Sequence, residues 1–78
     1  MSRAENEPLT QFGCRLRAAR KRKRLSQAGA AELAGIAAGR WSDYEIGKIA
    51  PNAATLPRIA AALGMRVGRL AELLLGAK

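Results

Sequence analysis

The chain contains no histidine, and Cys14 is its single cysteine in 78 residues. These scarcities exclude a Cys/His metal site and an intramolecular disulfide, and they leave no visible pair of nucleophile and base. We therefore expect no metal, no cofactor and no enzymatic activity, with Cys14 an ordinary helix residue. A small fold without disulfides is typical of a reducing environment, so we expect a cytoplasmic location.

Long apolar runs and acidic residues are also scarce. No segment approaches the roughly 18 consecutive apolar residues of a membrane span, and the amino terminus lacks the apolar stretch of a signal peptide. Fourteen Lys and Arg against six Asp and Glu give a net charge of +8. So strong a positive charge on a small chain favours a polyanionic partner, such as nucleic acid or an anionic membrane surface. The membrane is the weaker alternative, because no strongly apolar, aromatic helix face accompanies the charge.

Alternation of apolar and polar residues with a period of two is absent, so we expect no strand. Seventeen alanines and about twenty larger apolar residues indicate one thin core between short helices. The predicted fold is all-α, a compact five-helix domain.

Helix caps and glycines divide the chain into segments. Residues 1–9 are polar and contain Pro8, which predicts a flexible amino-terminal arm before a single domain at residues 10–78. Thr10 is a suitable N-cap for a first helix that reaches Lys23. The further helices are expected at Gln27–Ala34 after the cap Ser26, at Ala38–Glu45, from Asn52 or Thr55 to Leu63, and at about Val67–Leu75. The glycines that end helices are Gly35, Gly47 and Gly64, and a loop is expected at Ile46–Pro51.

Pro57 bears on the start of the fourth helix. If Thr55 is the cap, the proline takes the second helical position, where its missing N–H has no cost. If Asn52 is the cap, the first turn has to bend around the proline. The sequence leaves both starts open.

The segment Gln27–Glu45 has the layout of a helix-turn-helix: a short capped helix, a glycine turn and a second helix. Trp41 and Tyr44 stand three residues apart on that second helix, which favours a core position over a base-stacking platform.

Residues at consistent spacing from Phe12 to Leu74 extend this match without an insertion. They are Phe12-Gly13, Leu16-Arg17, Arg20, Leu25-Ser26-Gln27, Ala31, Gly35-Ile36, Glu45, Gly47-Lys48, Pro51, Ile59-Ala60 and Leu63-Gly64. Through them the chain resembles the lambda-repressor/Cro-type helix-turn-helix DNA-binding domain family. The resemblance implies binding of double-stranded DNA, with the second helix of the motif in the major groove.

The resemblance also implies roles for individual residues. Gln27 matches a glutamine that holds a phosphate, although it could be a plain first-turn residue. Arg20 and Glu45 match a partly buried ion pair between the first and third helices. The positions that imply DNA contact are Gln27, Ala38, Gly39, Arg40, Asp43 and Lys48.

The second helix of the motif carries few groups that read bases. Arg40 can bind guanine or clamp a phosphate and Asp43 can accept from cytosine N4, but the two could instead pair with each other on a solvated face. Ala37-Ala38-Gly39 offers only methyl groups and backbone, so few bases would be read directly. Ala30 occupies the place of a core leucine in the family, and we expect Leu33 or Trp41 to fill that space.

Seven of the 14 positive charges fall between Arg15 and Arg24. Several of them could bind DNA phosphates without sequence preference. Alternatively, they form a solvated helix end that complements the helix dipole.

Leu73-Leu74-Leu75 gives the last helix more apolar residues than one stripe needs. We expect a homodimer through Leu70, Leu73 and Leu74, which would place two recognition helices about 34 Å apart on successive major grooves. The alternative is a fraying helix with exposed leucines.

The sequence as a whole predicts a small dimeric transcriptional regulator of prokaryotic or phage type that binds a pseudo-palindromic operator. It would either repress by covering the operator or activate by recruiting RNA polymerase as a further partner, and its length resembles restriction–modification controller proteins. One alternative is an antitoxin that also holds a toxin protein. Another is a protein-interaction module that kept the fold without DNA binding.

Overall fold

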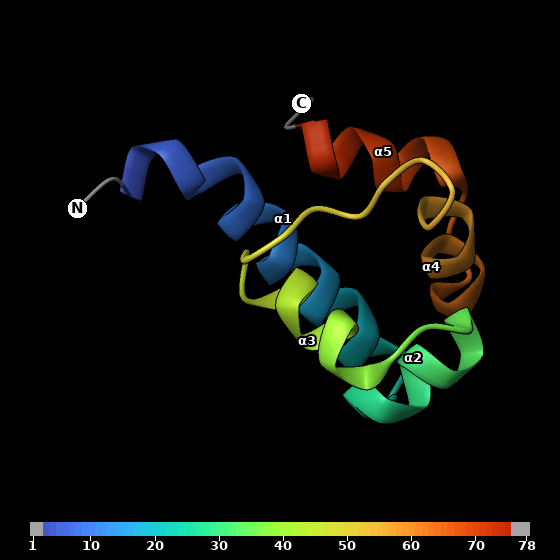
Figure 1. The fold of residues 1–78 in the computed structure, drawn as a ribbon. Coiled ribbons are helices and arrows are strands. Elements are labelled where there is room, and N and C mark those ends of the chain that lie inside the picture. Colours follow the sequence, from blue (N-terminus) through green and yellow to red (C-terminus); the bar gives the residue numbers. More distant parts are fainter. Residues whose placement is uncertain (1–2, 76–78) are drawn as a thin grey trace.

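Five α-helices make up the part of the chain that a computed structural model describes, residues 3–75, with the side chains of residues 9–72 and 74. They are α1 (Arg3–Arg22), α2 (Gln27–Ala34), α3 (Ala38–Glu45), α4 (Leu56–Leu63) and α5 (Val67–Leu75) (Figure 1). No strand occurs among these residues, so the all-α prediction is confirmed.

The helices pack as a closed circuit around the core. α1 contacts α3 and α5, α2 contacts α3 and α4, and α4 contacts α5. In Figure 1, α3 lies in front of α1, and α5 lies at the opposite end of the circuit from the α2–α3 turn. This arrangement leaves one side of α3 covered by α1 and α2 and its other side open to solvent.

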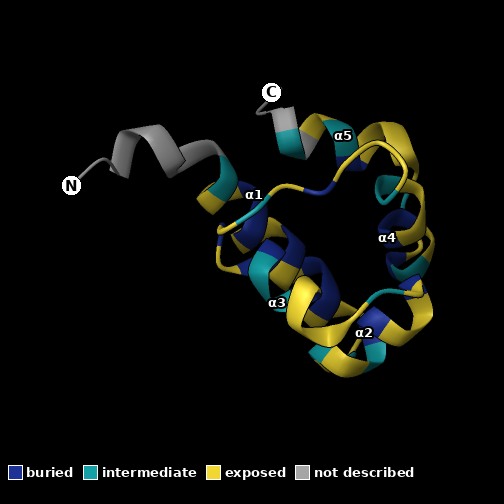
Figure 2. Ribbon diagram, in the orientation of Figure 1, coloured by how far each residue is buried: buried dark blue, intermediate teal, exposed yellow. Residues whose placement is uncertain are grey.

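All five helices contribute buried residues to the core, and Figure 2 colours the ribbon by burial. The largest fully buried ones are Phe12, Leu16, Trp41, Tyr44, Ile59, Leu63 and Leu70. Trp41 and Tyr44 are therefore core residues, as predicted. Leu33 is 62% exposed, so the expectation that it fills space beside Ala30 is wrong. It follows the buried Ala31 by two positions, and two helical residues turn the side chain by about 200°.

The first helix begins earlier than expected. α1 starts at Arg3, so the prediction of an N-cap at Thr10 is wrong. The segment 3–9 is polar, but polarity does not oppose a helix when Glu, Ala and Arg, which have high helix propensity, are present. The division into a flexible arm at 1–9 and a domain at 10–78 stays a prediction.

The ends of α2 and α4 follow the predicted signals. Ser26 caps α2 by accepting from the Gly29 N–H at 2.9 Å, and Gly35 ends α2 with a φ of 72°. Thr55 is the N-cap residue of α4 and places Pro57 at the second helical position. Asn52 closes the preceding turn, where its Oδ1 accepts from the Thr55 N–H at 2.8 Å.

None of the described helices is both long enough and apolar enough to span a membrane. Within the same residues, no group of three or more His, Cys, Asp and Glu side chains is placed to hold a metal ion.

Candidate nucleic-acid interface

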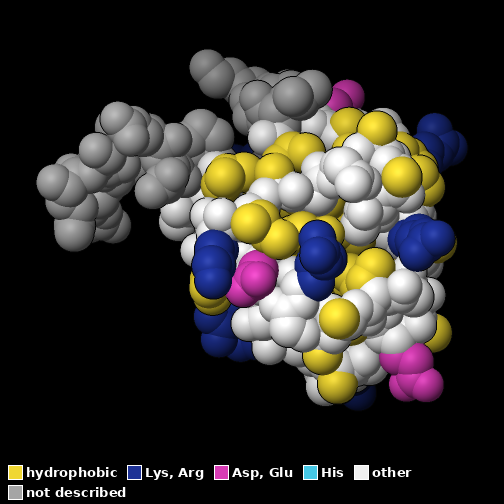
Figure 3. Space-filling model, viewed as in Figure 1, with side chains coloured by type: hydrophobic (Ala, Val, Ile, Leu, Met, Phe, Trp, Pro, Cys, Tyr) yellow, Lys and Arg dark blue, Asp and Glu magenta, His cyan; other side chains and the backbone are white. Residues whose placement is uncertain are grey.

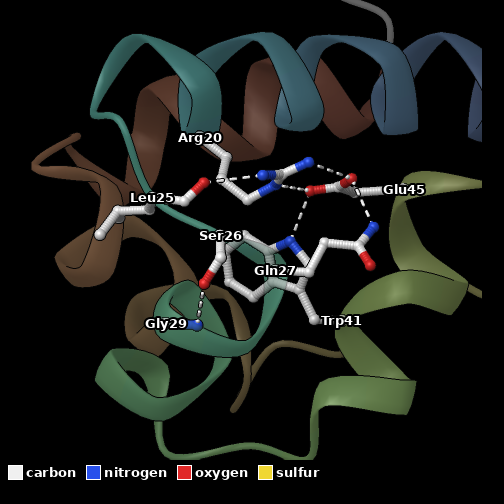
Figure 4. Close-up of polar contacts among 7 residues, drawn as sticks. All are labelled: Arg20, Leu25, Ser26, Gln27, Gly29, Trp41 and Glu45. Carbon is white, nitrogen blue, oxygen red and sulfur yellow. Dashed lines mark hydrogen bonds and ion pairs between the residues drawn. The ribbon is translucent and has the colours of Figure 1, made fainter.

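The junction of α1, α2 and α3 is organised by one buried carboxylate, Glu45, at the carboxyl end of α3 (Figure 4). Arg20 donates to it from Nε at 2.5 Å and from Nη2 at 3.2 Å. Gln27 Nε2 donates at 2.9 Å and Trp41 Nε1 at 2.6 Å. Glu45 therefore joins side chains from three helices, and the predicted ion pair with Arg20 is present.

The ionisation of Glu45 is set by two opposing effects. Burial alone would raise the pKa of Glu45, because its carboxylate loses hydration. The hydrogen bonds from Arg20, Gln27 and Trp41, together with the charge of Arg20, outweigh burial and lower this pKa below its ordinary value of 4.5. The carboxylate is thus charged at neutral pH and fully engaged by its donors.

Arg20 has a second partner that positions the start of α2. Its Nη1 donates to the Leu25 carbonyl at 2.7 Å, directly before the capping residue Ser26. The one guanidinium therefore fixes both the end of α3 and the beginning of α2, which are the two ends of the helix-turn-helix.

α1 and α3 touch through their backbones at Gly13. A Cβ at this position would lie 2.2 Å from the Glu45 carbonyl oxygen and 2.7 Å from the Tyr44 carbonyl oxygen. Only glycine allows so close an approach. Sequence reasoning noted Gly13 as part of the family match but missed this role. A glycine within a predicted helix was the available signal.

The loop after α3 is held against α1 at Thr10. Gly47 has a φ of 78°, and a Cβ there would lie 3.0 Å from Thr10 Cα. The next residue, Lys48, donates its N–H to the Asp43 carbonyl at 2.9 Å and exposes its side chain. Lys48 therefore stands on a restrained turn beside α3.

The outer face of α3 carries the predicted contact residues. Ala38, Gly39 and Arg40 are exposed and Asp43 is half-buried. A Cβ at Gly39 would meet nothing within 4 Å, so this part of α3 is open. The described structure has no ion pair between Arg40 and Asp43, since Arg20–Glu45 is the ion pair among the described side chains.

Gln27 points differently from the other predicted contacts. Its amide nitrogen donates inward to Glu45, and the residue is half-buried. It lies at the edge of the site, between the buried cluster and the solvent. This inward bond was not foreseen from the sequence, where only its place at the start of α2 was visible.

The basic run from Arg15 to Arg24 is divided between two environments. Arg20 is buried in the cluster with Glu45, and the other six cations are exposed. On the face that presents α3, Lys and Arg outnumber Asp and Glu (Figure 3). Arg20 is therefore not available to bind DNA phosphates. Phosphate binding by the six exposed cations stays a prediction.

The structure describes the side chains of two of the three predicted dimer residues on α5, Leu70 and Leu74. Leu70 is fully buried in the core of its own chain, so its assignment to a dimer interface is wrong. Leu70 belongs to the stripe that packs α5 onto α1 and α4, which leaves no part of its side chain for a partner. Leu74 is half-buried against the core, and the side chain of Leu73 lies outside those that the structure describes.

Sequence reasoning also missed Arg58 on α4. Its Nη1 donates to the Gly35 carbonyl at 3.4 Å, at the carboxyl end of α2. The two residues are 23 positions apart, and no local signal links them. This contact ties the turn of the helix-turn-helix to the rest of the domain.

The fold and this junction define a helix-turn-helix domain. Residues 11–74 match the family model described as a helix-turn-helix domain, and the chain belongs to this family. A solved structure with the same fold is the clp gene regulator ClgR from C. glutamicum, with a TM-score of 0.74 and 25% identity. The similarity covers 88% of this chain and 90% of that chain. No curated protein matches the chain.

Proposed function

We propose that this protein is a transcriptional regulator that binds double-stranded DNA as a homodimer at a pseudo-palindromic operator. One observation carries the proposal: the outer face of α3 is open, while its inner face is locked to α1 and α2 through Glu45. A rigid helix with a free face is what insertion into a major groove requires. The similarity to ClgR, a gene regulator, supports the same function.

The exposed residues suggest how the groove would be read. Arg40 would contact a base edge or a phosphate, and the Ala38 methyl group could contact a thymine methyl. Gly39 lets the backbone come close to the DNA. Because Ala38 and Gly39 offer no side-chain donor or acceptor, we propose that few base pairs are read directly and that much of the affinity comes from phosphate contacts.

Phosphate contacts are proposed for Gln27 and Lys48. An amide nitrogen carries two N–H groups, so Gln27 can donate one to Glu45 and the other to a phosphate. Its place as the first residue of α2 would add the free backbone N–H groups of the helix amino terminus. Lys48 would bind the backbone beside α3 from its restrained turn.

The proposed dimer follows from the size of α3. Its eight residues extend about 12 Å, so a single copy can contact only a few base pairs. Two copies on successive major grooves would double that contact. We place the dimer contact on α5, where Val67 is exposed and Leu74 is half-buried. Leu70 is buried in the core of its own chain and holds α5 in place.

A salt titration of binding to a labelled mixed-sequence duplex tests DNA binding, with fluorescence anisotropy as the readout. With about six phosphates contacted, log K should fall with log salt concentration at a slope near −5. Lys48→Gln should reduce this slope by about 1. Arg66→Gln, which removes the same charge away from α3, is the matched control and should leave the slope unchanged.

Failure to bind any duplex at low salt would contradict the proposal and favour a protein-interaction module. Stable co-purification with a small partner protein that blocks DNA binding would instead favour an antitoxin.

A further inference from the structure

Two adjoining clefts lie between α1 and the segment that joins α4 to α5. Their volumes are about 620 Å³ and about 270 Å³. They share Ala19 and Arg22 of α1 with Met65 and Arg69 of the opposite wall. Together they form one elongated cleft along α1, which we call the α1–α5 cleft.

The walls of the α1–α5 cleft are strongly cationic. Five of the lining residues are cations: Arg15, Arg22, Lys23, Arg66 and Arg69. All five are exposed, and none pairs with a carboxylate that the structure describes. No Asp or Glu lines either cleft among the described side chains.

The stability of the fold accounts for only part of this charge. Arg22 and Lys23 stand at the carboxyl end of α1, where the helix dipole favours cations. Arg66 and Arg69, however, stand at the amino end of α5, whose first turn has no acidic residue. Cations are unfavourable at that end. Five positive charges around one cleft also repel one another and so destabilise the fold, and a bound anion would reduce this repulsion.

The α1–α5 cleft lies away from the proposed DNA-binding face. Gly13 marks the side of α1 that touches α3. Arg15 and Arg22 follow it by two and nine positions, which turns both side chains by about 180–200° around the helix. DNA on the outer face of α3 would therefore leave this cleft open.

The floor of the cleft is apolar. Leu63 and Ala19 are buried beneath it, and Met65 is half-buried at its surface. A methionine side chain is flexible and adapts to different apolar groups. The site thus offers a narrow apolar strip between two cationic walls.

From these features we propose that the α1–α5 cleft binds an acidic segment of a partner protein, one that inserts an apolar side chain between flanking carboxylates. A concave cleft fits a peptide better than the convex surface of a duplex or the flat surface of a bilayer. A second copy of this chain is disfavoured in the cleft, because symmetric pairing would bring two cationic clefts together. The dimer contact proposed on α5 uses Val67 and Leu74, which do not line the cleft. The site does not depend on DNA binding.

The test is a titration of the whole chain with a labelled, end-capped helical peptide that carries leucines on one face and glutamates on both sides. The control peptide has glutamine in place of each glutamate. We expect saturable, salt-sensitive binding of the acidic peptide and at least about tenfold weaker binding of the control, since a charge-assisted contact is lost at each site.

Two double variants that each remove two positive charges distinguish binding in the cleft from non-specific electrostatic attraction of the peptide. Arg22→Gln with Arg69→Gln should weaken peptide binding at least about tenfold. Arg17→Gln with Lys21→Gln, on another side of α1, should change it less than about twofold. Each folded state is checked by circular dichroism, and backbone amide shifts on peptide addition should fall on residues 15–23 and 63–69.

Any of four results would overturn the proposal. They are no peptide binding, equal weakening in both double variants, displacement of the peptide by duplex DNA, and binding of anionic lipid vesicles without binding of the peptide.

Discussion

The Gln27 side chain donates to Glu45 over 2.9 Å and so joins the first residue of α2 to the last residue of α3. The angle between these two helices determines how a helix-turn-helix lies on DNA. Because Arg20 and Trp41 bind the same carboxylate, the two helices and α1 are fixed at a single buried point. The cluster thus links a core ion pair to the proposed DNA-binding surface.

Removal of this carboxylate should strongly destabilise the fold. Glu45→Ala leaves the Arg20 guanidinium buried without a counter-charge, which typically costs about 3–5 kcal/mol. Urea unfolding followed by circular dichroism measures the loss. Glu32→Ala, which removes an exposed carboxylate from α2, should change the free energy of unfolding by less than about 0.5 kcal/mol. Equal stability of Glu45→Ala and the wild type would show that the ion pair contributes nothing.

The lowered pKa of Glu45 predicts a dependence of stability on pH. The folded state binds a proton at Glu45 less readily than the unfolded state, so this contribution is complete above the ordinary pKa of 4.5 and is lost as pH falls through the lowered value. Urea unfolding at several pH values between neutral and strongly acidic should show the loss.

Glu45→Gln provides the comparison, because it has no titrating group at this position. The difference in unfolding free energy between wild type and Glu45→Gln should shrink as the solution is acidified. A constant difference at all pH values would contradict a lowered pKa.

The backbone contact at Gly13 predicts opposite effects of one substitution at two glycines. Gly13→Ala places a methyl group 2.2 Å from the Glu45 carbonyl oxygen, which forces α1 and α3 apart and should cost about 1–3 kcal/mol or more. Gly39→Ala meets no atom within 4 Å and should gain up to about 1 kcal/mol from helix propensity. Thermal melts of both variants without DNA test this prediction. A melting temperature of Gly13→Ala equal to that of the wild type would contradict the close backbone contact.

Arg24 is predicted to be a strained position. It has a φ of 60°, the one positive value on a non-glycine residue among the described residues. A left-handed conformation costs an L-residue about 1–2 kcal/mol, so Arg24→Gly should raise stability by up to about 1 kcal/mol, after the unfolded-state cost of glycine. Arg17→Gly, in the interior of α1, should lower stability by about 1 kcal/mol. Destabilisation by both variants would show that Arg24 is not strained.

The helix-turn-helix was predictable because its signals are local. Ser26 before α2 and Gly35 after it act within one turn of the helix ends, and the bounds of α2 follow from them. The start of α1 had no such signal, because the residues before Thr10 are polar but compatible with a helix.

Contacts between distant residues could not be derived in the same way. The spacing of the leucines in residues 67–75 is the same whether they face their own core or a partner, so Leu70 was wrongly placed at an interface. The approach of Gly13 to Glu45 and the convergence of Arg22 and Arg69 on one cleft likewise depend on how the helices cross. No periodicity in the sequence carries that information.

Binding of DNA by Arg40→Ala tests the central claim, that the open face of α3 reads base pairs. A duplex selected from a random pool and a mixed-sequence duplex are titrated at one salt concentration, with Arg69→Ala as the control of equal charge. Arg40→Ala should lose about 1–3 kcal/mol on the selected duplex and less on the mixed one, whereas Arg69→Ala should match the wild type on both. Unchanged affinity of Arg40→Ala for the selected duplex, or an equal loss on the two duplexes, would contradict base reading by α3.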